Sequence, residues 1–164
     1  MNYICIGKIV NTHGIKGEVR ILSDFLYKNE IFATENNLYI GKKKDKVIVN
    51  SYRRHKMFDM LTFKGINNIN DVLKYKGEFI YFDRDEVKLP GLIDEDYIGL
   101  DVYDGEKLIG SVISIMKGRP HDNLVIEKAG NRNLIPNIPV FVKRIDIENK
   151  KIEVESIEGL IHED

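Results

Sequence analysis

The residues of this chain that could do chemistry are mostly cations placed beside turns. His13, Lys16 and Arg20 lie on and next to a connection bracketed by Gly14 and Gly17. Exposed backbone and cations of this kind can meet the phosphates of RNA, where binding depends on charge rather than on sequence. The alternative is a turn that barrel closure demands, in which the glycines supply backbone geometry only. The phosphate loop of nucleotide enzymes is excluded, because no Gly-Lys-Ser/Thr follows and no helix is expected there.

A second basic cluster lies between positions 42 and 56, where Asp45 is the only acid. Its members are Lys42, Lys43, Lys44, Lys46, Arg53, Arg54 and Lys56. Arginine can bridge phosphates in a bidentate manner whereas lysine acts as a point charge, so Arg53 and Arg54 favour RNA contact. For the lysines, a solvated turn that resists aggregation is the alternative. Tyr52 could stack on a base, but a tyrosine that ends a strand more often serves packing.

The second half of the chain offers a loop and an apolar strip. Arg119 and His121 belong to the loop 118–122, and Ile138 and Phe141 belong to a strip that begins at Pro136. The two apolar side chains suit the buried centre of a protein interface, although closing the end of a barrel would require them equally. Acidic residues near the C-terminus alternate with apolar ones, which is typical of the solvated face of a hairpin. Their joint field would attract a lysine-rich protein.

No spacing predicts a catalyst, a metal centre or a cofactor site. Cys5 is the single cysteine and lies between isoleucines, which favours a small core residue over a reactive thiol. The four histidines are scattered, and no pair of carboxylates converges. Asp83, Asp85 and Glu86 form the densest acidic group near a strand end, and such a run is usually a solvated loop.

Length and charge bound the possibilities further. With 164 residues, 43% of them hydrophobic, the chain can hold one domain or two small ones. It has neither a secretory leader nor an apolar run long enough for a membrane helix, so a cytoplasmic protein is expected. Residues 1–89 hold 16 Lys+Arg and 11 Asp+Glu, a net +5, whereas residues 90–164 hold 9 and 15, a net −6. The opposite signs indicate two kinds of partner, or two ordinary solvated surfaces.

The elements that must position these residues are predominantly strands. In the first half we expect strands at 3–10, 19–22, 47–49, 60–63 and 78–82, a long loop over 24–37 and a basic connection over 53–56. One helix is expected over 67–76, capped by Asn68 or Asn70 and stopped by Gly77. Pro90-Gly91 marks the boundary. The second half predicts three hairpins, 100–103 with 107–115, 124–126 with 134–135, and 145–148 with 152–155, which indicate a small barrel.

With these motifs in place, the chain resembles the RimM family of ribosome maturation factors over nearly its full length. The first matching piece is His13-Gly14-Ile15-Lys16-Gly17-Glu18-Val19, followed by the helix that ends at Gly77 and by Ile98-Gly99-Leu100. The last piece is the pattern Asp122-Asn123-Leu124-Val125, Leu134-Ile135-Pro136, Val142-Lys143, Asp146 and Gly159-Leu160. Four pieces in the right order make coincidence improbable.

The resemblance implies an all-β fold with one short helix, made of two small β-barrels in tandem. A six-stranded barrel similar to those of translation factors is expected over 1–89, a linker over 90–97 and a PRC-type barrel over 98–164. The implied function is that of a non-catalytic assembly factor, a chaperone that binds the immature small (30S) ribosomal subunit near its head. Its partners would be a basic head-domain ribosomal protein and 16S rRNA, whose maturation it promotes. A monomer without membrane contact is expected.

One departure from the family pattern concerns the linker. The family carries two adjacent tyrosines shortly before an Asp-Leu-Ile-Gly block, and the resemblance ties them to subunit binding. Here the block is Asp96-Tyr97-Ile98-Gly99, and the paired positions fall on Leu92 and Ile93. Aliphatic contacts therefore replace aromatic ones, and Tyr97 is the aromatic side chain left to compensate.

These observations define two sets of candidate residues. The predicted RNA set consists of His13, Lys16, Arg20, Arg53, Arg54 and Lys56. The predicted protein set consists of Leu92, Ile93, Tyr97, Arg119, His121, Ile138 and Phe141. Two other functions compete with the assembly factor: a metal-dependent RNA-processing nuclease, and a stand-alone RNA-binding module based on the first barrel alone.

Overall fold

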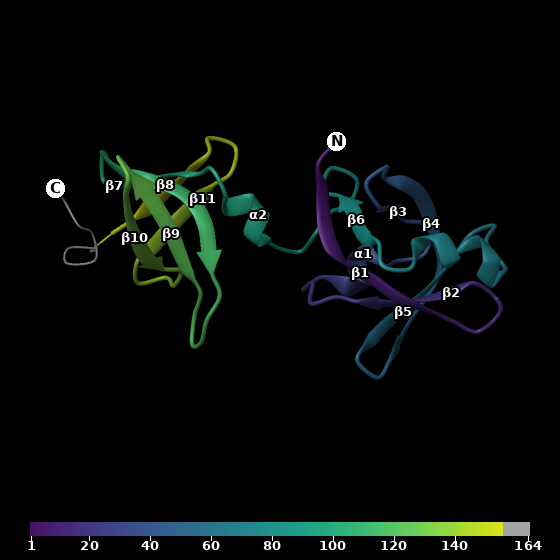
Figure 1. Cartoon of the computed structure of the whole chain (residues 1–164). Helices are drawn as coiled ribbons and strands as arrows, with labels where there is room; N and C mark the ends of the chain where they lie inside the picture. The colour runs from purple at the N-terminus through teal and green to yellow at the C-terminus, as the bar shows by residue number, and fades with distance from the viewer. Residues whose placement is uncertain (156–164) are drawn as a thin grey trace. The chain divides into compact units, whose positions relative to one another are not determined.

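The computed structural model describes residues 1–155 of the chain (Figure 1). The chain divides into two compact units, Met1–Pro90 and Gly91–Asp164. The C-terminal end of the predicted second domain, including Gly159-Leu160 of the family pattern, lies outside the described residues. Among residues 1–155, no helix has the length and apolar character needed to cross a membrane.

Unit 1 is a closed six-stranded barrel in which β1 pairs with β2 and β6 closes the ring onto β1. The strands are β1 (Tyr3–His13), β2 (Glu18–Leu22), β3 (Asn37–Ile40), β4 (Asp45–His55), β5 (Phe58–Phe63) and β6 (Phe79–Asp83). Their order around the barrel is β1-β2-β5-β4-β3-β6, and every neighbouring pair is antiparallel. Closure leaves no free sheet edge. The predicted six-stranded barrel is confirmed.

The barrel core explains why the prediction for Cys5 was wrong. Ile4 and Ile6 are buried inside the barrel, whereas Cys5 pairs with Tyr81 on the outer face and is exposed. A strand of a small barrel has only one apolar side, so alternate residues must face outward. Ile9 is four residues after Cys5, and in a regular strand it would face outward like Cys5. It is fully buried instead, because the register of β1 shifts between Cys5 and Gly7.

Two local predictions in unit 1 require correction. The expected helix over 67–76 is a pair of 3-10 turns, Ile69–Asp71 and Leu73–Tyr75, with the Asn68 side chain accepting a hydrogen bond from the Asn70 N–H. The segment is too short for a stable α-helix and is held by burial of Val72 and Tyr75. The expected long loop over 24–37 contains a short helix, α1 (Lys28–Ile31). The sequence predicted one helix and did not predict this one.

The basic connection expected over 53–56 is mostly strand. Residues 53–55 continue β4, and only Lys56 and Met57 form the turn to β5. Lys56 has a φ of +57°, which such a two-residue hairpin turn requires. Side chains in this stretch therefore alternate between the two faces of the barrel wall, and this decides which of them can meet a partner.

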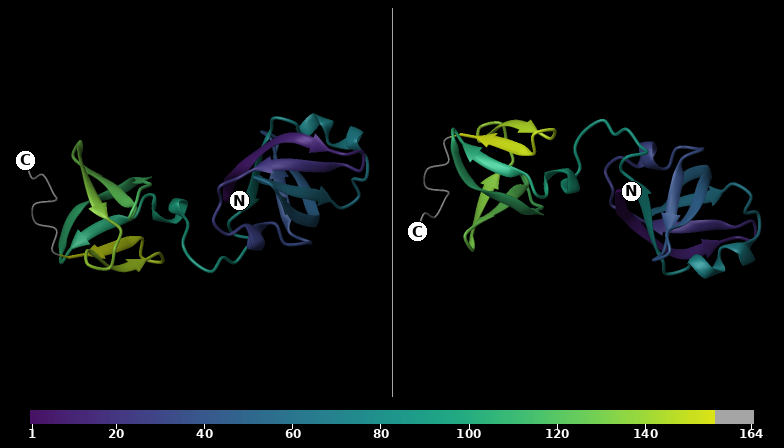
Figure 2. Two further views of the ribbon diagram at one scale, coloured as in Figure 1. Left: turned by 90° about the horizontal axis from the view of Figure 1, so that it is seen from below. Right: turned by 90° about the horizontal axis from the view of Figure 1, so that it is seen from above.

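Unit 2 is a six-stranded sheet with the order β10-β9-β8-β7-β12-β11 (Figure 2). Its strands are β7 (Asp101–Asp104), β8 (Lys107–Met116), β9 (Asn123–Lys128), β10 (Asn131–Pro136), β11 (Val142–Asp146) and β12 (Lys151–Val154). The three predicted hairpins are present, and β12 returns to pair with β7 in the parallel sense. The core contains Val102, Leu124 and Ile152, all fully buried. The stretch 90–97 that was predicted as a linker contains the short helix α2 (Asp94–Tyr97).

Candidate nucleic-acid and protein interfaces

The structure brings three members of the predicted RNA set together on the outer face of unit 1. Arg20 of β2 and Arg53 of β4 both pair with Met60 of β5, so they point to the same side of the wall. The Arg20 Nη2 lies 2.7 Å from the Nδ1 of His13. Because a guanidinium can only donate, His13 accepts at Nδ1 and carries its ring proton on Nε2. The rings of His13 and His55 lie 6.1 Å apart, which adds a second imidazole to the group.

Arg53 is already engaged within the protein. Its Nη2 and Nε lie 2.7 and 3.0 Å from the two carboxylate oxygens of Glu18, a bidentate pair. The hydrogen bond from Arg53, together with its positive charge, holds the pKa of Glu18 below its ordinary value. A phosphate at this position would have to compete with a carboxylate that has matching geometry.

Arg54 faces the opposite side of the wall and stabilises a buried carboxylate. Asp59 has no exposed surface, and its Oδ1 lies 3.1 Å from the Arg54 Nη1. Lys28 reaches Asp59 Oδ2 at 2.9 Å, an ion pair without the directional geometry of a hydrogen bond. The Tyr52 hydroxyl donates to Oδ1 at 2.7 Å, and its ring lies 5.0 Å from that of Phe32. Tyr52 therefore serves the interior of the barrel, and Arg54 is a counter-ion of Asp59.

Lys16 and Lys56 lie at two separate hairpin tips, and both are exposed. Lys16 belongs to the turn 14–17 that precedes Glu18, at the start of β2. Lys56 precedes β5, and the first residues of β5 pair with the end of β2, since Asp59 is opposite Ile21. The two lysines are thus at opposite ends of the β2–β5 pair, and the predicted RNA set does not form one continuous patch.

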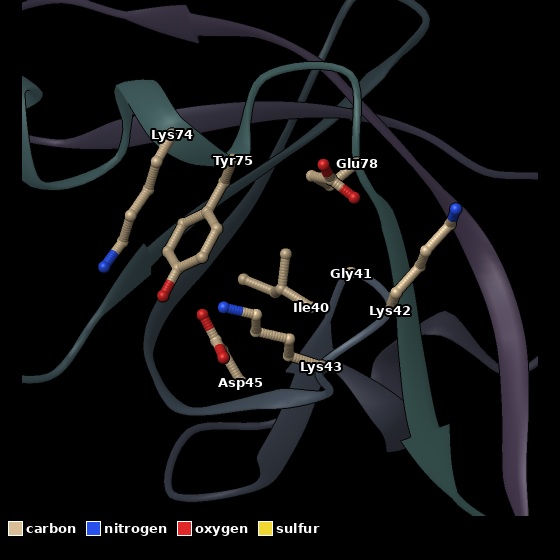
Figure 3. A pocket seen from close by; sticks show the side chains of 8 residues that line it. All are labelled: Ile40, Gly41, Lys42, Lys43, Asp45, Lys74, Tyr75 and Glu78. Atoms are coloured by element: carbon tan, nitrogen blue, oxygen red, sulfur yellow. The ribbon is translucent and has the colours of Figure 1, made fainter.

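A basic hollow beside β3 and β6 joins Lys42 and Lys43 of the second basic cluster to residues of the segment 74–78, which the sequence did not place beside them (Figure 3). It has a volume of about 380 Å³ and is lined by Ile40, Gly41, Lys42, Lys43, Asp45, Lys74, Tyr75 and Glu78. We call it the lysine hollow. The hydroxyl of Tyr75 points toward the amine of Lys43 and the carboxylate of Asp45. Within residues 1–155 its three lysines form no ion pair, in contrast to Arg53 and Arg54. Only closure of the barrel brings residues 74–78 to the turn 41–44.

In unit 2 the three segments of the predicted protein set meet at one end. The Lys117 amine bridges Asp94 Oδ1 of α2 at 3.0 Å and Asp122 Oδ2 of the loop at 2.9 Å. These hydrogen bonds raise the pKa of Lys117, and the bond from Lys117 lowers the pKa of Asp122. Asn137 donates through its backbone N–H to the Asp122 carbonyl at 2.9 Å and through Nδ2 to the Tyr97 hydroxyl at 3.3 Å. Lys117 and Asn137, neither of them predicted, therefore assemble this end.

Several members of the predicted protein set are needed for packing. Ile93 is 6% exposed, and its backbone N–H donates to Asp96 Oδ2 at 2.9 Å at the start of α2. Tyr97 and Phe141 are partly buried against the core of unit 2. Leu92, His121 and Ile138 are half-buried, and Arg119 is exposed. Of this set, therefore, only Ile93 is buried away from a partner; Arg119 is exposed and the other members are partly accessible.

The acidic group near the end of β6 serves local structure. Asp83 is buried and accepts hydrogen bonds from the backbone N–H groups of Asn2 and Asp85. Glu86 accepts from the Tyr39 hydroxyl and from Asn37 Nδ2. Over the part of the chain that is described, no three His, Cys, Asp or Glu side chains are grouped to hold a metal ion. No feature of the described residues thus favours the nuclease alternative.

Comparison with known proteins matches both units to domains of one family. A model of the RimM N-terminal domain matches residues 4–87, and a model of the RimM PRC barrel domain matches residues 94–160. Ribosome maturation factors RimM from Streptococcus agalactiae and Streptococcus thermophilus are 39% and 41% identical over the whole of both chains. A solved structure of a 16S ribosomal RNA processing protein RimM from Pseudomonas aeruginosa is 24% identical, with a TM-score of 0.48 over 94% of this chain and 98% of that one.

Proposed function

This chain belongs to the RimM family of ribosome maturation factors, and we propose that it is a non-catalytic assembly factor of the small ribosomal subunit. It binds the immature 30S subunit near its head by contact with a basic head-domain ribosomal protein, and it promotes 16S rRNA maturation in the cytoplasm. The observation that carries the proposal is the match of both RimM domains, in order, together with relatives of that name that cover the full chain.

The charge distribution supports two different contacts. The first 89 residues carry a net charge of +5 and suit RNA, whereas the last 75 carry −6 and suit a lysine-rich protein. A protein that holds RNA and ribosomal protein together favours the arrangement in which both are correctly placed. It can shift that population only by the difference between its affinities for the two arrangements.

The end of unit 2 assembled by Lys117 and Asn137 is the surface we assign to the ribosomal protein. Of the aliphatic pair that replaces the family's tyrosines, Ile93 is buried, so Leu92 is the member that can reach a partner. Ile138 and His121 supply further partly exposed surface beside it, and Arg119 lies at its rim. A small apolar centre with a polar rim is the arrangement typical of a specific protein contact.

Sedimentation of cell extract through a density gradient tests the proposal. The chain is expected to be enriched on free, immature small subunits and depleted from translating ribosomes, because the surface it needs is occupied or rearranged once assembly is complete. Equal abundance per subunit in both fractions would contradict the assembly role. Extract in which assembly is stalled serves as a positive control, since free subunits accumulate in it.

A second assay separates the assembly factor from the nuclease alternative. Purified chain is incubated with precursor 16S rRNA and magnesium, with and without a chelator. We expect the precursor to remain intact in both samples. Cleavage that disappears in the chelator would establish metal-dependent hydrolysis and refute a non-catalytic role.

A further inference from the structure

One outward face of the unit 1 barrel combines partly exposed aromatic rings with lysines that form no ion pair within residues 1–155. It spans β1 and β6 and the turn between β3 and β4. We call it the aromatic–lysine face, and its members are Tyr3, Lys8, Lys44, Phe79 and Tyr81. It shares no residue with the predicted RNA set, and Lys44 is its one member that belongs to the second basic cluster of the sequence.

Strand register places these side chains together. Phe79 and Tyr81 alternate along β6 with Ile80 and Phe82, which are fully buried in the core, so the first pair faces outward. Phe79 pairs with Lys8 of β1. Half of the Phe79 side chain is exposed. Phe79 is the first residue of β6, and its half-exposed ring extends the aromatic surface of Tyr81 on the same face of the strand.

The lysines lie over the rings. The Lys8 Nζ is 5.7 Å from the centroid of Phe79. The Lys44 Nζ is 4.1 Å from the centroid of Tyr81 and 5.7 Å from that of Tyr3. Each cation is thereby held beside an aromatic face, as a protein needs for binding a base and its phosphate at neighbouring points.

The lysines of this face are not held by acids of the chain itself. In residues 1–155 neither Lys8 nor Lys44 takes part in an ion pair. Of the carboxylates on β6 and the following turn, Asp83 and Glu86 accept hydrogen bonds from neutral local donors and keep their charge, but neither is paired with a lysine of the face. The lysine hollow adjoins the face, since the Gly41 N–H donates to the Phe79 carbonyl at 2.9 Å. Its three lysines outnumber its two carboxylates and extend the positive surface past Phe79.

We propose that the aromatic–lysine face binds a segment of single-stranded RNA. Bases stack on Phe79 and Tyr81 in place of the ammonium groups of Lys8 and Lys44, which turn to the flanking phosphates. Unpaired bases are required, because in a duplex their faces are already stacked and unavailable to the rings. The inference deepens the proposed function and rests on it for the identity of the RNA, while the site itself is tested on a free oligonucleotide.

Fluorescence offers a direct test, since the chain contains no tryptophan. In the full-length chain, Phe79→Trp keeps an aromatic ring on the face and reports stacking by quenching. Met57→Trp at the exposed tip of the β4–β5 hairpin is the matched control, beside the predicted RNA set. A short single-stranded RNA of mixed sequence should quench the indole emission of the Phe79→Trp chain and leave that of the Met57→Trp chain unchanged. Quenching at position 57 only, or at neither position, overturns the proposal.

Two glycine substitutions test the charge. Lys44 and Lys150 are both turn lysines with a φ of +54°, so Lys44→Gly and Lys150→Gly remove the same charge and relax the same backbone. Only Lys44→Gly should weaken RNA binding, and it should reduce the slope of log affinity against log salt by about 0.7, the value for one phosphate contact on a single strand. Equal losses in both variants, or no loss, contradict the assignment.

Three probes separate the alternatives. The same RNA annealed to its complement should bind more weakly and quench less, because its bases are stacked. Polyglutamate should fail to compete at equal charge, and effective competition would indicate an acidic protein as the occupant and overturn the RNA site.

Co-sedimentation of Phe79→Ala with small subunits is measured in parallel. If Phe79→Ala still sediments with small subunits and the oligonucleotide does not quench Phe79→Trp, this site is refuted but the proposed function is not. If the unmodified chain is not enriched on immature small subunits, the proposed function is refuted.

Discussion

At the scale of single residues, neighbours in sequence have opposite roles because strand alternation sends them to opposite sides of the wall. Arg53 meets Glu18 on the outer face, while Arg54 is a counter-ion of the buried Asp59. Both were expected to contact RNA, and both donate hydrogen bonds to carboxylates of the chain itself, although each side chain is 51% exposed. Among residues 1–155, Lys16 and Lys56 of the predicted RNA set, Lys44 and the three lysines of the hollow form no ion pair. Residue type alone is therefore a poor guide to which cations can contact RNA. The partner that each cation has within the chain is the better guide.

The Tyr52–Asp59 hydrogen bond should make the barrel sensitive to alkali. Burial, and then the bond to Asp59, raise the pKa of Tyr52 to about 12, from an ordinary value of about 10. The folded state thus disfavours the phenolate, so this contribution to stability is fully present below pH about 10 and is lost as pH rises through about 12. Urea unfolding of Tyr52→Phe should give a free energy of unfolding that is lower by about 1 kcal/mol at neutral pH. As the pH is raised, that free energy should fall less than it does in the unmodified chain.

Tyr27→Phe is the control for that experiment, because its hydroxyl forms no hydrogen bond within residues 1–155. It should reproduce the pH profile of the unmodified chain. The raised pKa of Tyr39, caused by burial and then by the bond to Glu86, leaves a residual alkaline loss in every variant. An unchanged profile in Tyr52→Phe would show that Tyr52 does not contribute.

At the scale of elements, the turn 14–17 is built to pack against a later segment. A Cβ on Gly17 would lie 3.3 Å from the Ile66 carbonyl and from the backbone of Asn68. The Ile69 N–H donates to the Ile15 carbonyl at 3.0 Å, which fixes the turn against the 3-10 segment. Gly14, by contrast, has open space around the same position. The two glycines of the family motif therefore serve backbone geometry, but only one serves close packing.

Alanine at the two glycines should separate these requirements. Both have positive φ, +73° at Gly14 and +91° at Gly17, so each substitution strains the backbone. Gly14→Ala is expected to lower the free energy of unfolding by about 1 kcal/mol, and Gly17→Ala by about 2–3 kcal/mol, because the added methyl also meets backbone atoms. Chemical denaturation of the two variants checks this. Equal losses would mean that the 66–68 segment moves aside freely.

At the scale of the whole molecule, the chain joins a basic barrel to an acidic sheet, and the proposed function needs both. RNA contact through charge alone does not discriminate an immature subunit from other RNA. Under the proposed function, contact with a specific ribosomal protein would supply that discrimination. The positive unit would add affinity and the negative unit would add specificity, because the linked units bind neighbouring sites at a high effective concentration.

Removal of residues 92–164 should therefore abolish specific association with small subunits. The remaining barrel is expected to keep its strand signal in circular dichroism and to retain weak, salt-sensitive RNA binding. Sedimentation with purified immature subunits is the measurement, and a bulk RNA competitor distinguishes specific from general binding. A truncated chain that sediments as well as the full chain would instead support the stand-alone RNA module.

Much of this fold followed from the order of residues. Alternation of apolar side chains and turn glycines predicted most strands and the hairpins of unit 2, and Pro90-Gly91 coincides with the division between the two units. The motif from His13 to Val19 and the pattern from Asp122 onward indicated the family that the comparisons bear out. These features are local or depend on fixed spacing along the chain, so they can be read without coordinates. The helix over 67–76 failed because a short segment follows tertiary burial more than its own propensity.

The contacts within the sites depended on tertiary structure. The outward position of Cys5, the Arg53–Glu18 pair, the charge network of Asp59 and the gathering of Tyr3, Lys44 and Tyr81 join positions far apart in sequence. Closure of the barrel and the register shifts in β1 set which residues become neighbours, and neither is written in any short stretch. In unit 2 likewise, Lys117 and Asn137 unite three segments because the sheet returns them to one end. Sequence thus determined the family and the strands, and tertiary structure decided which charges remain free.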